Sequence, residues 1–266
     1  MNLVLTGSST GIGKFLADAL AAKDHAVCRL ARSAQEGFAL RADVSNWNDL
    51  AAAAGEVAQK WKSVDALICC AGVQEPIGPA MEIAPAAWRN ALAVNLDGTF
   101  FSIRAFYPLL KKSPQRAKVI CFSGGGSTGP RPNFAAYGVS KTGVVRLVET
   151  LATEWQNQPL DINAVAPGTI FTQMTEQVLA SGAAVAGQKE FESASKLPRD
   201  NAATLAKVLG LVEFLLSEKS NGISGRLLSA PWDPWPALDK HRDELAASDI
   251  YTLRRIVPED RGKKWS

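Results

Sequence analysis

Short apolar segments alternate along the chain with longer segments in which apolar residues recur every three or four positions. The short segments predict buried strands at residues 3–6, 26–30, 66–70, 119–123, 161–165 and 226–230. The longer segments predict amphipathic helices at residues 12–23, 47–60, 86–112, 135–156 and 201–217. Because strands that alternate with helices form βαβ units, we predict an α/β fold with a single doubly wound parallel sheet and helices on both faces.

Glycine-containing and polar segments directly follow several of the predicted strands. Right-handed connections bring the carboxyl ends of the strands to one edge of the sheet, where open α/β sheets bind their ligands. The segments expected at this edge are residues 7–13, Ala71-Gly72, Ser123 and Pro167-Gly168. The sequence therefore predicts a ligand site at this edge.

The run Thr6-Gly7-Ser8-Ser9-Thr10-Gly11-Ile12-Gly13 connects the first predicted strand to the first predicted helix. Glycines let the backbone turn tightly and approach a pyrophosphate, and a helix N-terminus offers free N–H groups to the phosphate charge. The spacing is GxxxGxG rather than the GxGxxG of many dinucleotide-binding domains. The position of the run after the first strand therefore carries more weight than the glycines themselves.

Tyr137 and Lys141 lie four residues apart in a predicted helix and therefore share one helix face. A phenol is a poor acid or base near neutrality because its pKa is about 10, but a neighbouring ammonium favours the phenolate and lowers that pKa. Such a pair can pass a proton to or from a substrate oxygen.

Composition limits the remaining classes of function. The 266 residues, 47% of them hydrophobic, are enough to bury one sizeable core. The net charge of +3 is mild, and no dense Lys/Arg stripe with interleaved aromatic residues indicates a nucleic-acid partner. No apolar run approaches the roughly 18 residues of a membrane span, and the first strand begins too early to leave room for a signal peptide. We expect a cytoplasmic protein without a membrane partner.

The four cysteines lie in or beside predicted strands, without the spacing of a metal site. We expect Cys28, Cys69, Cys70 and Cys121 to be reduced and buried, and we expect neither disulfides nor a metal.

With these motifs in this order, the chain resembles the short-chain dehydrogenase/reductase family, in the form with a TGxxxGIG nucleotide loop and a YxxxK pair. The likeness extends from Met1 to about Trp232 and includes Asp43-Val44, Ala71-Gly72, Asn95, Pro167-Gly168, Thr172 and Ile223-Ser224-Gly225. It implies a Rossmann-type catalytic domain over residues 1–236, with a substrate lid at about 172–199. Residues 237–266 would be a C-terminal extension of the same domain.

The resemblance also assigns cofactor contacts to Gly7, Ser9, Thr10, Gly11, Ile12, Gly13, Arg32, Asp43, Val44, Ala71, Gly72, Tyr137, Lys141, Pro167, Gly168, Ile170 and Thr172. In the family's pattern Asp43 and Val44 bracket the adenine, and Ala71-Gly72 lies under the adenosine ribose. Thr172 contacts the carboxamide or a phosphate.

The residues after the second strand favour NADP over NAD. In the family's register, Ala31 stands where NAD-preferring members carry Asp, and Arg32 follows it, able to pair with a 2′-phosphate. Thr10 stands where some NADP-preferring relatives place a basic residue, and Lys14 is expected to compensate in part.

Two positions depart from the family's pattern. Cys69-Cys70 replaces a pair of asparagines before Ala71-Gly72, which removes amide groups near the adenosine ribose. Gly124 stands where the family places the serine that binds the substrate carbonyl. Ser123 is our first choice to replace that serine and Ser127 the second; the exposed N–H groups of the glycine run are a third possibility.

The mechanism implied by the resemblance is hydride transfer between NADPH and a small-molecule carbonyl or alcohol. Tyr137 would donate the proton, Lys141 would lower the pKa of Tyr137 and bind the nicotinamide ribose, and Ser123 would orient the carbonyl. Asn95 would kink its helix and hold a water of the proton relay. A 3-oxoacyl reductase and a sugar or polyol dehydrogenase are both compatible with the sequence, and Gly124 leaves open a nucleotide-binding regulatory or scaffold protein whose chemistry has decayed.

The family commonly assembles through helices that correspond to residues 86–112 and 135–156, so we expect a homodimer or homotetramer. The extension after Trp235 either wraps its own subunit or crosses to a neighbouring one.

Overall fold

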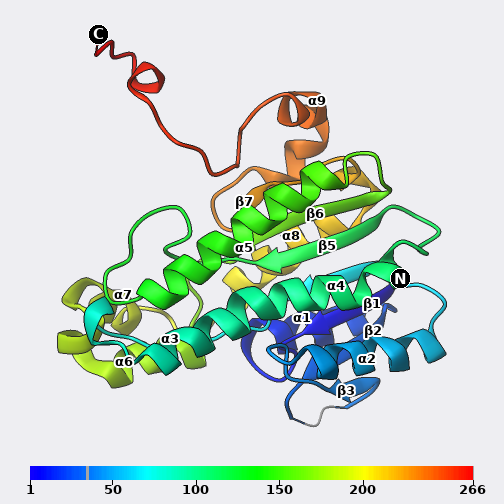
Figure 1. Cartoon of the computed structure of the whole chain (residues 1–266), viewed down its shortest axis with the longest axis horizontal. Helices are drawn as coiled ribbons and strands as arrows, with labels where there is room; N and C mark the ends of the chain where they lie inside the picture. The colour runs from blue at the N-terminus through cyan, green and yellow to red at the C-terminus, as the bar shows by residue number, and fades with distance from the viewer. Residues whose placement is uncertain (34–35, 266) are drawn as a thin grey trace.

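Seven parallel strands form one sheet in the order β3-β2-β1-β4-β5-β6-β7 (Figure 1). The computed structural model describes residues 1–33 and 36–265. The strands are β1 (Asn2–Thr6), β2 (Ala26–Ala31), β3 (Ala39–Arg41), β4 (Ala66–Cys69), β5 (Ala117–Phe122), β6 (Leu160–Ala166) and β7 (Leu227–Ser229). Every pairing is parallel, so the carboxyl ends of all strands meet at one edge, and the strand order reverses between β1 and β4. This is the predicted Rossmann-type sheet, and its switch point is where such sheets bind ligands.

Helices cover both faces of the sheet (Figure 1). They are α1 (Gly11–Ala21), α2 (Trp47–Lys60), α3 (Pro85–Leu92), α4 (Gly98–Leu110), α5 (Ala135–Glu154), α6 (Gln173–Ala186), α7 (Gln188–Ser195), α8 (Ala202–Leu216) and α9 (Arg242–Ala246). Helices α2, α4 and α5 pack on one face, and α1 and α8 pack on the other. None of the helices in the described ranges is both long and apolar enough to cross a membrane.

The two cores follow from the alternation of side chains along each strand. Val4 belongs to the core under α2, α4 and α5, whereas its neighbours Leu3 and Leu5 belong to the core under α1 and α8. All three side chains are fully buried. A strand buried on both faces is mostly apolar, which explains the apolar runs of the predicted strands, although β5 and β6 also bury Lys118, Asp161 and Asn163.

Several elements differ from the sequence prediction. Helices α6 and α7 lie within the predicted lid and were not among the predicted helices. Strand β3 was not predicted, because three half-buried or exposed residues at the sheet edge show no apolar run. The prediction of one helix over residues 86–112 was wrong, because a π-helical turn at Ala93–Asp97 separates α3 from α4. Such turns insert one extra residue into a helix and often mark functional positions. The turn is centred on Asn95.

The C-terminal extension has two parts with different packing. Residues 237–253 lie on the body of the protein: Leu238 and Leu245 are buried in the core under α1 and α8. The buried Arg226 guanidinium donates hydrogen bonds to the carbonyls of Leu245, Ser248 and Ile250. The last residues, coloured red in Figure 1, run away from the body. The first part therefore belongs to the structure of the domain.

Candidate active site

A cleft of about 1270 Å³ opens at the carboxyl edge of the sheet. It brings together segments that are far apart in the sequence: the glycine turn, Ala71-Gly72, Ser123 and Pro167-Gly168. Every residue that the sequence assigned to the cofactor lines this cleft, and so do Ser123 and Ser127. Among the predicted catalytic residues, Asn95 does not line the cleft, because it is fully buried behind the wall.

The glycine turn is held against the sheet so closely that side chains are excluded. Gly7 has a φ of +71°, and a Cβ atom there would lie 2.6 Å from the backbone of Ala71. A Cβ atom on Gly13 would lie 2.1 Å from the carbonyl oxygen of Gly7. The side chain of Thr10, the residue before α1, does not cap the first turn of that helix. The compact turn and uncapped N–H groups fit the pyrophosphate of a dinucleotide.

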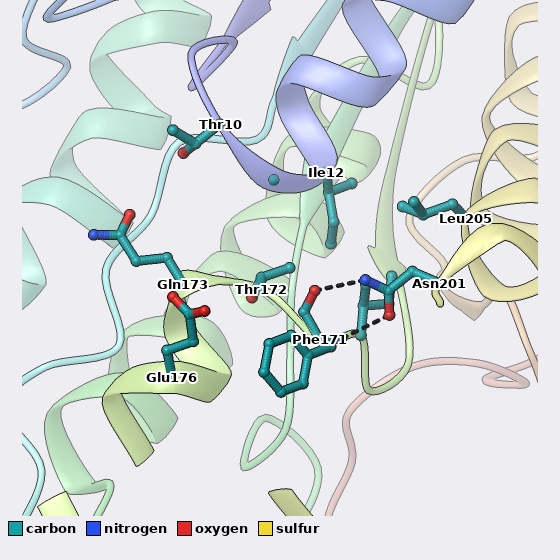
Figure 2. A pocket seen from close by; sticks show the side chains of 10 residues that line it. Thr10, Ile12, Phe171, Thr172, Gln173, Glu176, Asn201 and Leu205 are labelled. Atoms are coloured by element: carbon teal, nitrogen blue, oxygen red, sulfur yellow. Dashed lines mark hydrogen bonds between the residues drawn. The ribbon is translucent and has the colours of Figure 1, made fainter. Parts of the chain in front are cut away.

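A second pocket of about 500 Å³ lies beside the cleft, between the start of α1 and the start of the lid helix α6 (Figure 2). The Asn201 side chain accepts a hydrogen bond from the Phe171 N–H at 2.9 Å and donates one to the Phe171 carbonyl at 2.6 Å. The next residue, Thr172, forms a reciprocal cap with Thr175. Asn201 therefore fixes the entry to the lid, a role that the sequence did not reveal because these partners are thirty residues apart.

Tyr137 and Lys141 lie in the first turns of α5 and are both buried, with 8% and 4% of their surfaces exposed. The Lys141 Nζ lies 5.9 Å from the centroid of the Tyr137 ring and donates a hydrogen bond to the Phe122 carbonyl at 2.9 Å. Burial raises the pKa of Tyr137, and the positive charge of Arg131 opposes that rise. Burial also lowers the pKa of Lys141. Arg131 is thus a cation whose charge acts on the Tyr137 pKa, and the lowering expected from Lys141 stays a prediction.

Neutral thiols surround the Lys141 ammonium. Cys69 and Cys121 are paired residues of β4 and β5. The hydrogen bond between Cys69 and Cys121, followed by burial, raises the pKa of Cys69. Burial raises the pKa of Cys70 to about 12. Cysteines in place of the asparagines expected from the family's pattern thus remove amide hydrogen-bonding groups near Lys141 without adding a negative charge.

Gly124 allows the Tyr137 hydroxyl to pack against the backbone at the end of β5. A Cβ atom on Gly124 would lie 2.2 Å from the Tyr137 hydroxyl oxygen. No side chain fits there while Tyr137 holds this position. The neighbouring Ser123 is 3% exposed, and its Oγ has no hydrogen-bond partner within the described residues. A buried hydroxyl without a partner costs folding free energy and calls for an explanation.

Asn95 joins the loop after β4 to α5. Its Oδ1 accepts from the Val73 N–H at 2.8 Å, and its Nδ2 donates to the Val73 carbonyl and the Ser140 Oγ, each at 2.9 Å. Ser140 lies between Tyr137 and Lys141 and donates in turn to the Tyr137 carbonyl. The water that the resemblance assigns to Asn95 stays a prediction; the contacts observed are those of a clamp.

Arg131 connects the active-site loop to the lid, and the sequence did not single it out. Its guanidinium stacks 3.8 Å from the centroid of the Phe134 ring and forms an ion pair with Glu190 of α7 at 2.8 Å. The elements α5, β6 and α6 lie between Arg131 and Glu190 in the sequence, so no local sequence pattern links the two residues.

At the adenosine end of the cleft, burial raises the pKa of Asp43, but hydrogen bonds from Ser45 and, to a lesser extent, the charge of the exposed Arg32 lower it below its usual value. The Asp43 Oδ1 accepts hydrogen bonds from the N–H and Oγ of Ser45. Lys14 forms an ion pair with Asp18 on the surface of α1 and does not line the cleft. Of these two cations, Arg32 lines the cleft and Lys14 does not.

Comparison with known proteins agrees with this geometry. A family model described as enoyl-(acyl carrier protein) reductase matches residues 8–230. Galactitol 2-dehydrogenase (L-tagatose-forming) from Cereibacter sphaeroides is 36% identical over 184 residues, which cover 64% of this chain and 72% of that protein. The 3-oxoacyl-(acyl-carrier-protein) reductase FabG of Staphylococcus epidermidis is 28% identical over 240 residues, covering 85% of this chain and 95% of that protein.

A short-chain dehydrogenase from Shigella flexneri, solved in complex with NADP, has the same fold, with a TM-score of 0.73 at 22% identity. The match covers 86% of this chain and 96% of that chain. The chain belongs to the short-chain dehydrogenase/reductase family. It is an oxidoreductase of that family, acting between CH–OH and C=O with a nicotinamide cofactor.

Proposed function

We propose that the protein is an NADP-dependent oxidoreductase that reduces a ketone or aldehyde to an alcohol, or catalyses the reverse reaction. One observation carries the proposal: the buried hydroxyls of Tyr137 and Ser123 flank Gly124 in the same cleft as the glycine turn. Two hydroxyl donors next to a dinucleotide-binding turn are what a carbonyl group needs when its carbon takes up a hydride and its oxygen becomes an alkoxide.

The nicotinamide, when bound, supplies the hydride or accepts it. Tyr137 donates its hydroxyl proton to the carbonyl oxygen as negative charge develops there, and Ser123 donates a hydrogen bond that orients the same oxygen. Lys141 stabilises the phenolate that remains and is held in place by the Phe122 carbonyl. Asn95 keeps the loop after β4 fixed against α5, so that the walls of the cleft keep their spacing.

Arg32 supports the preference for NADP. Arg32 is exposed at the end of β2 and lines the cleft next to Asp43. There its guanidinium would form an ion pair with a 2′-phosphate. Ala31 offers no carboxylate to repel that phosphate. We extend the proposal to a cytoplasmic homodimer or homotetramer acting on a small molecule, without nucleic-acid or membrane partners.

The relatives suggest two classes of substrate for this chain, a sugar or polyol and a 3-oxoacyl thioester. The test is a panel of ketones, aldehydes, alcohols and one enoyl thioester, followed by NADPH and NADH absorbance. We expect turnover of a carbonyl with NADPH in preference to NADH. Cofactor binding without turnover of any compound would instead favour the decayed regulatory or scaffold protein, and turnover of the enoyl thioester alone would contradict carbonyl reduction.

A further inference from the structure

Gln74 carries a second buried polar group without a partner in the wall of the cleft. It lies in the loop that follows β4, and only 5% of its surface is exposed. Its Nε2 has no hydrogen-bond partner among the residues that the structure describes. Because buried amide groups in native proteins are almost always hydrogen-bonded, this donor calls for a partner from outside the chain.

The backbone before Gln74 is fixed. Val73 donates one hydrogen bond to the Asn95 side-chain amide and accepts another from it. On the other side, the exposed Glu75 side chain, not its backbone, accepts a hydrogen bond at 3.1 Å from Gln177 of helix α6, so the main-chain restraint comes from Val73. The same loop reaches the Tyr137–Lys141 pair, since a Cβ atom on Gly72 would lie 3.3 Å from the Lys141 Nζ. The Gln74 amide is therefore a preorganised group and not a mobile surface side chain.

The donors already assigned to the reacting carbonyl oxygen indicate what remains for Gln74 to bind. A carbonyl oxygen has two lone pairs, and the proposed mechanism fills both with the hydroxyls of Tyr137 and Ser123. The Gln74 amide is then a third group with no acceptor on the reacting oxygen. An amide both donates and accepts, so either a second carbonyl or a hydroxyl of the substrate can satisfy it.

We propose that Gln74 is a substrate-binding residue that hydrogen-bonds a second oxygen of the substrate, so that the enzyme acts on carbonyls with a neighbouring hydroxyl or carbonyl group. This inference rests on the proposed carbonyl reduction and deepens it. It favours hydroxyketones and 3-oxoacyl compounds over simple ketones. It also gives a structural reason for a substrate preference, which the lid residues do not give.

The test compares two matched pairs of probes, hydroxyacetone with 2-butanone and ethyl acetoacetate with 2-hexanone. Gln74→Met removes the amide with little change of size, and Gln74→Glu removes the donor. Gln59→Met, at an exposed position of α2, is the control for glutamine replacement. The readouts are kcat/KM for each probe, NADPH affinity by fluorescence, and the melting temperature.

We expect both Gln74 variants to lose about tenfold to hundredfold in kcat/KM for the oxygenated probes, the effect of one or two lost hydrogen bonds. The simple ketones should change by less than about threefold, and NADPH affinity should stay the same. The melting temperature of Gln74→Met should not fall, because that variant removes an unpartnered buried group.

Equal losses on both members of a pair, accompanied by a lower melting temperature, would assign Gln74 a structural role and overturn the inference. Unchanged kinetics would overturn it too, as would a wild-type enzyme that prefers the simple ketones. A wild-type protein that binds NADPH but reduces none of the four probes, nor any carbonyl of the wider panel, would contradict the proposed function itself, independently of the variants.

Discussion

Lys141 is a buried cation whose surroundings disfavour its charge. Only 4% of its surface is exposed, its one hydrogen bond goes to the Phe122 carbonyl, and no carboxylate in the described ranges pairs with it. Burial lowers its pKa, and the thiols around it oppose that shift only partly. A cation kept under these conditions reduces folding stability, which is common for groups that an active site needs.

Replacement of Lys141 by methionine should therefore stabilise the protein while abolishing turnover. Near pH 7 we expect the free energy of unfolding to rise by about 1–3 kcal/mol, because the desolvated charge is gone. The folded-state pKa of Lys141 is lower than the ordinary value of 10.5, so the unfolded chain binds the proton more tightly. The wild type then gains stability as the pH rises from the folded-state pKa towards 10.5, and the advantage of the variant should shrink over that range.

Urea denaturation of both proteins near pH 7 and near pH 9.5 measures this difference. An advantage that grows with pH, or a variant less stable than the wild type near neutrality, would show that the Lys141 ammonium stabilises the fold.

Among the elements, the π-helical turn between α3 and α4 has the clearest connection to the site. It presents Asn95 to the loop after β4 and to Ser140 of α5 at once. An α-helical turn would place the following residues differently, because the π turn adds one residue. The turn thus holds together three segments that line or support the cleft.

Asn95→Ala removes three hydrogen bonds and leaves the backbone groups of Val73 unpaired. We expect a loss of about 2–4 kcal/mol in the free energy of unfolding and a fall in kcat, because the loop after β4 is no longer held against α5. Asn157→Ala, at an exposed position after α5, is the matched control and should change neither quantity. Full activity and stability in Asn95→Ala would show that the clamp is dispensable.

The limits of sequence-based prediction are also clearest among the elements. The glycine turn, the YxxxK pair and the buried strands were predictable because each depends on residues that are close in the sequence. Gln74, Arg131 and Asn201 were not, because their surroundings are set by segments that are distant in the sequence, such as the π-helical turn, α7 and Phe171. Strand β3 was missed because an edge strand of three residues buries too little surface to show a pattern.

At the scale of the whole molecule, the C-terminal extension has two parts that should contribute differently to folding stability. Removing residues 254–266 should leave the free energy of unfolding unchanged within about 0.5 kcal/mol, because this part runs away from the body (Figure 1). Removing residues 237–266 should cost about 3 kcal/mol or more or prevent folding, because Leu238 and Leu245 leave the core and Arg226 loses its carbonyl partners.

Denaturation and light scattering of the two truncated chains test this division and the expected homo-oligomer together. Loss of assembly with the shorter truncation alone would mean that residues 254–266 contact a neighbouring subunit. A stable fold after the longer truncation would contradict the packing described for residues 237–253.

The turnover of Tyr137→Phe tests the proposed mechanism most directly, because this substitution removes only one oxygen atom, from the group that is proposed to transfer the proton. We expect kcat for NADPH-dependent carbonyl reduction to fall by about a thousandfold, within the usual range for loss of a general acid, while NADPH affinity measured by fluorescence changes little. Undiminished turnover in Tyr137→Phe, with NADPH still bound, would contradict proton transfer by this residue and with it the mechanism proposed for the cleft.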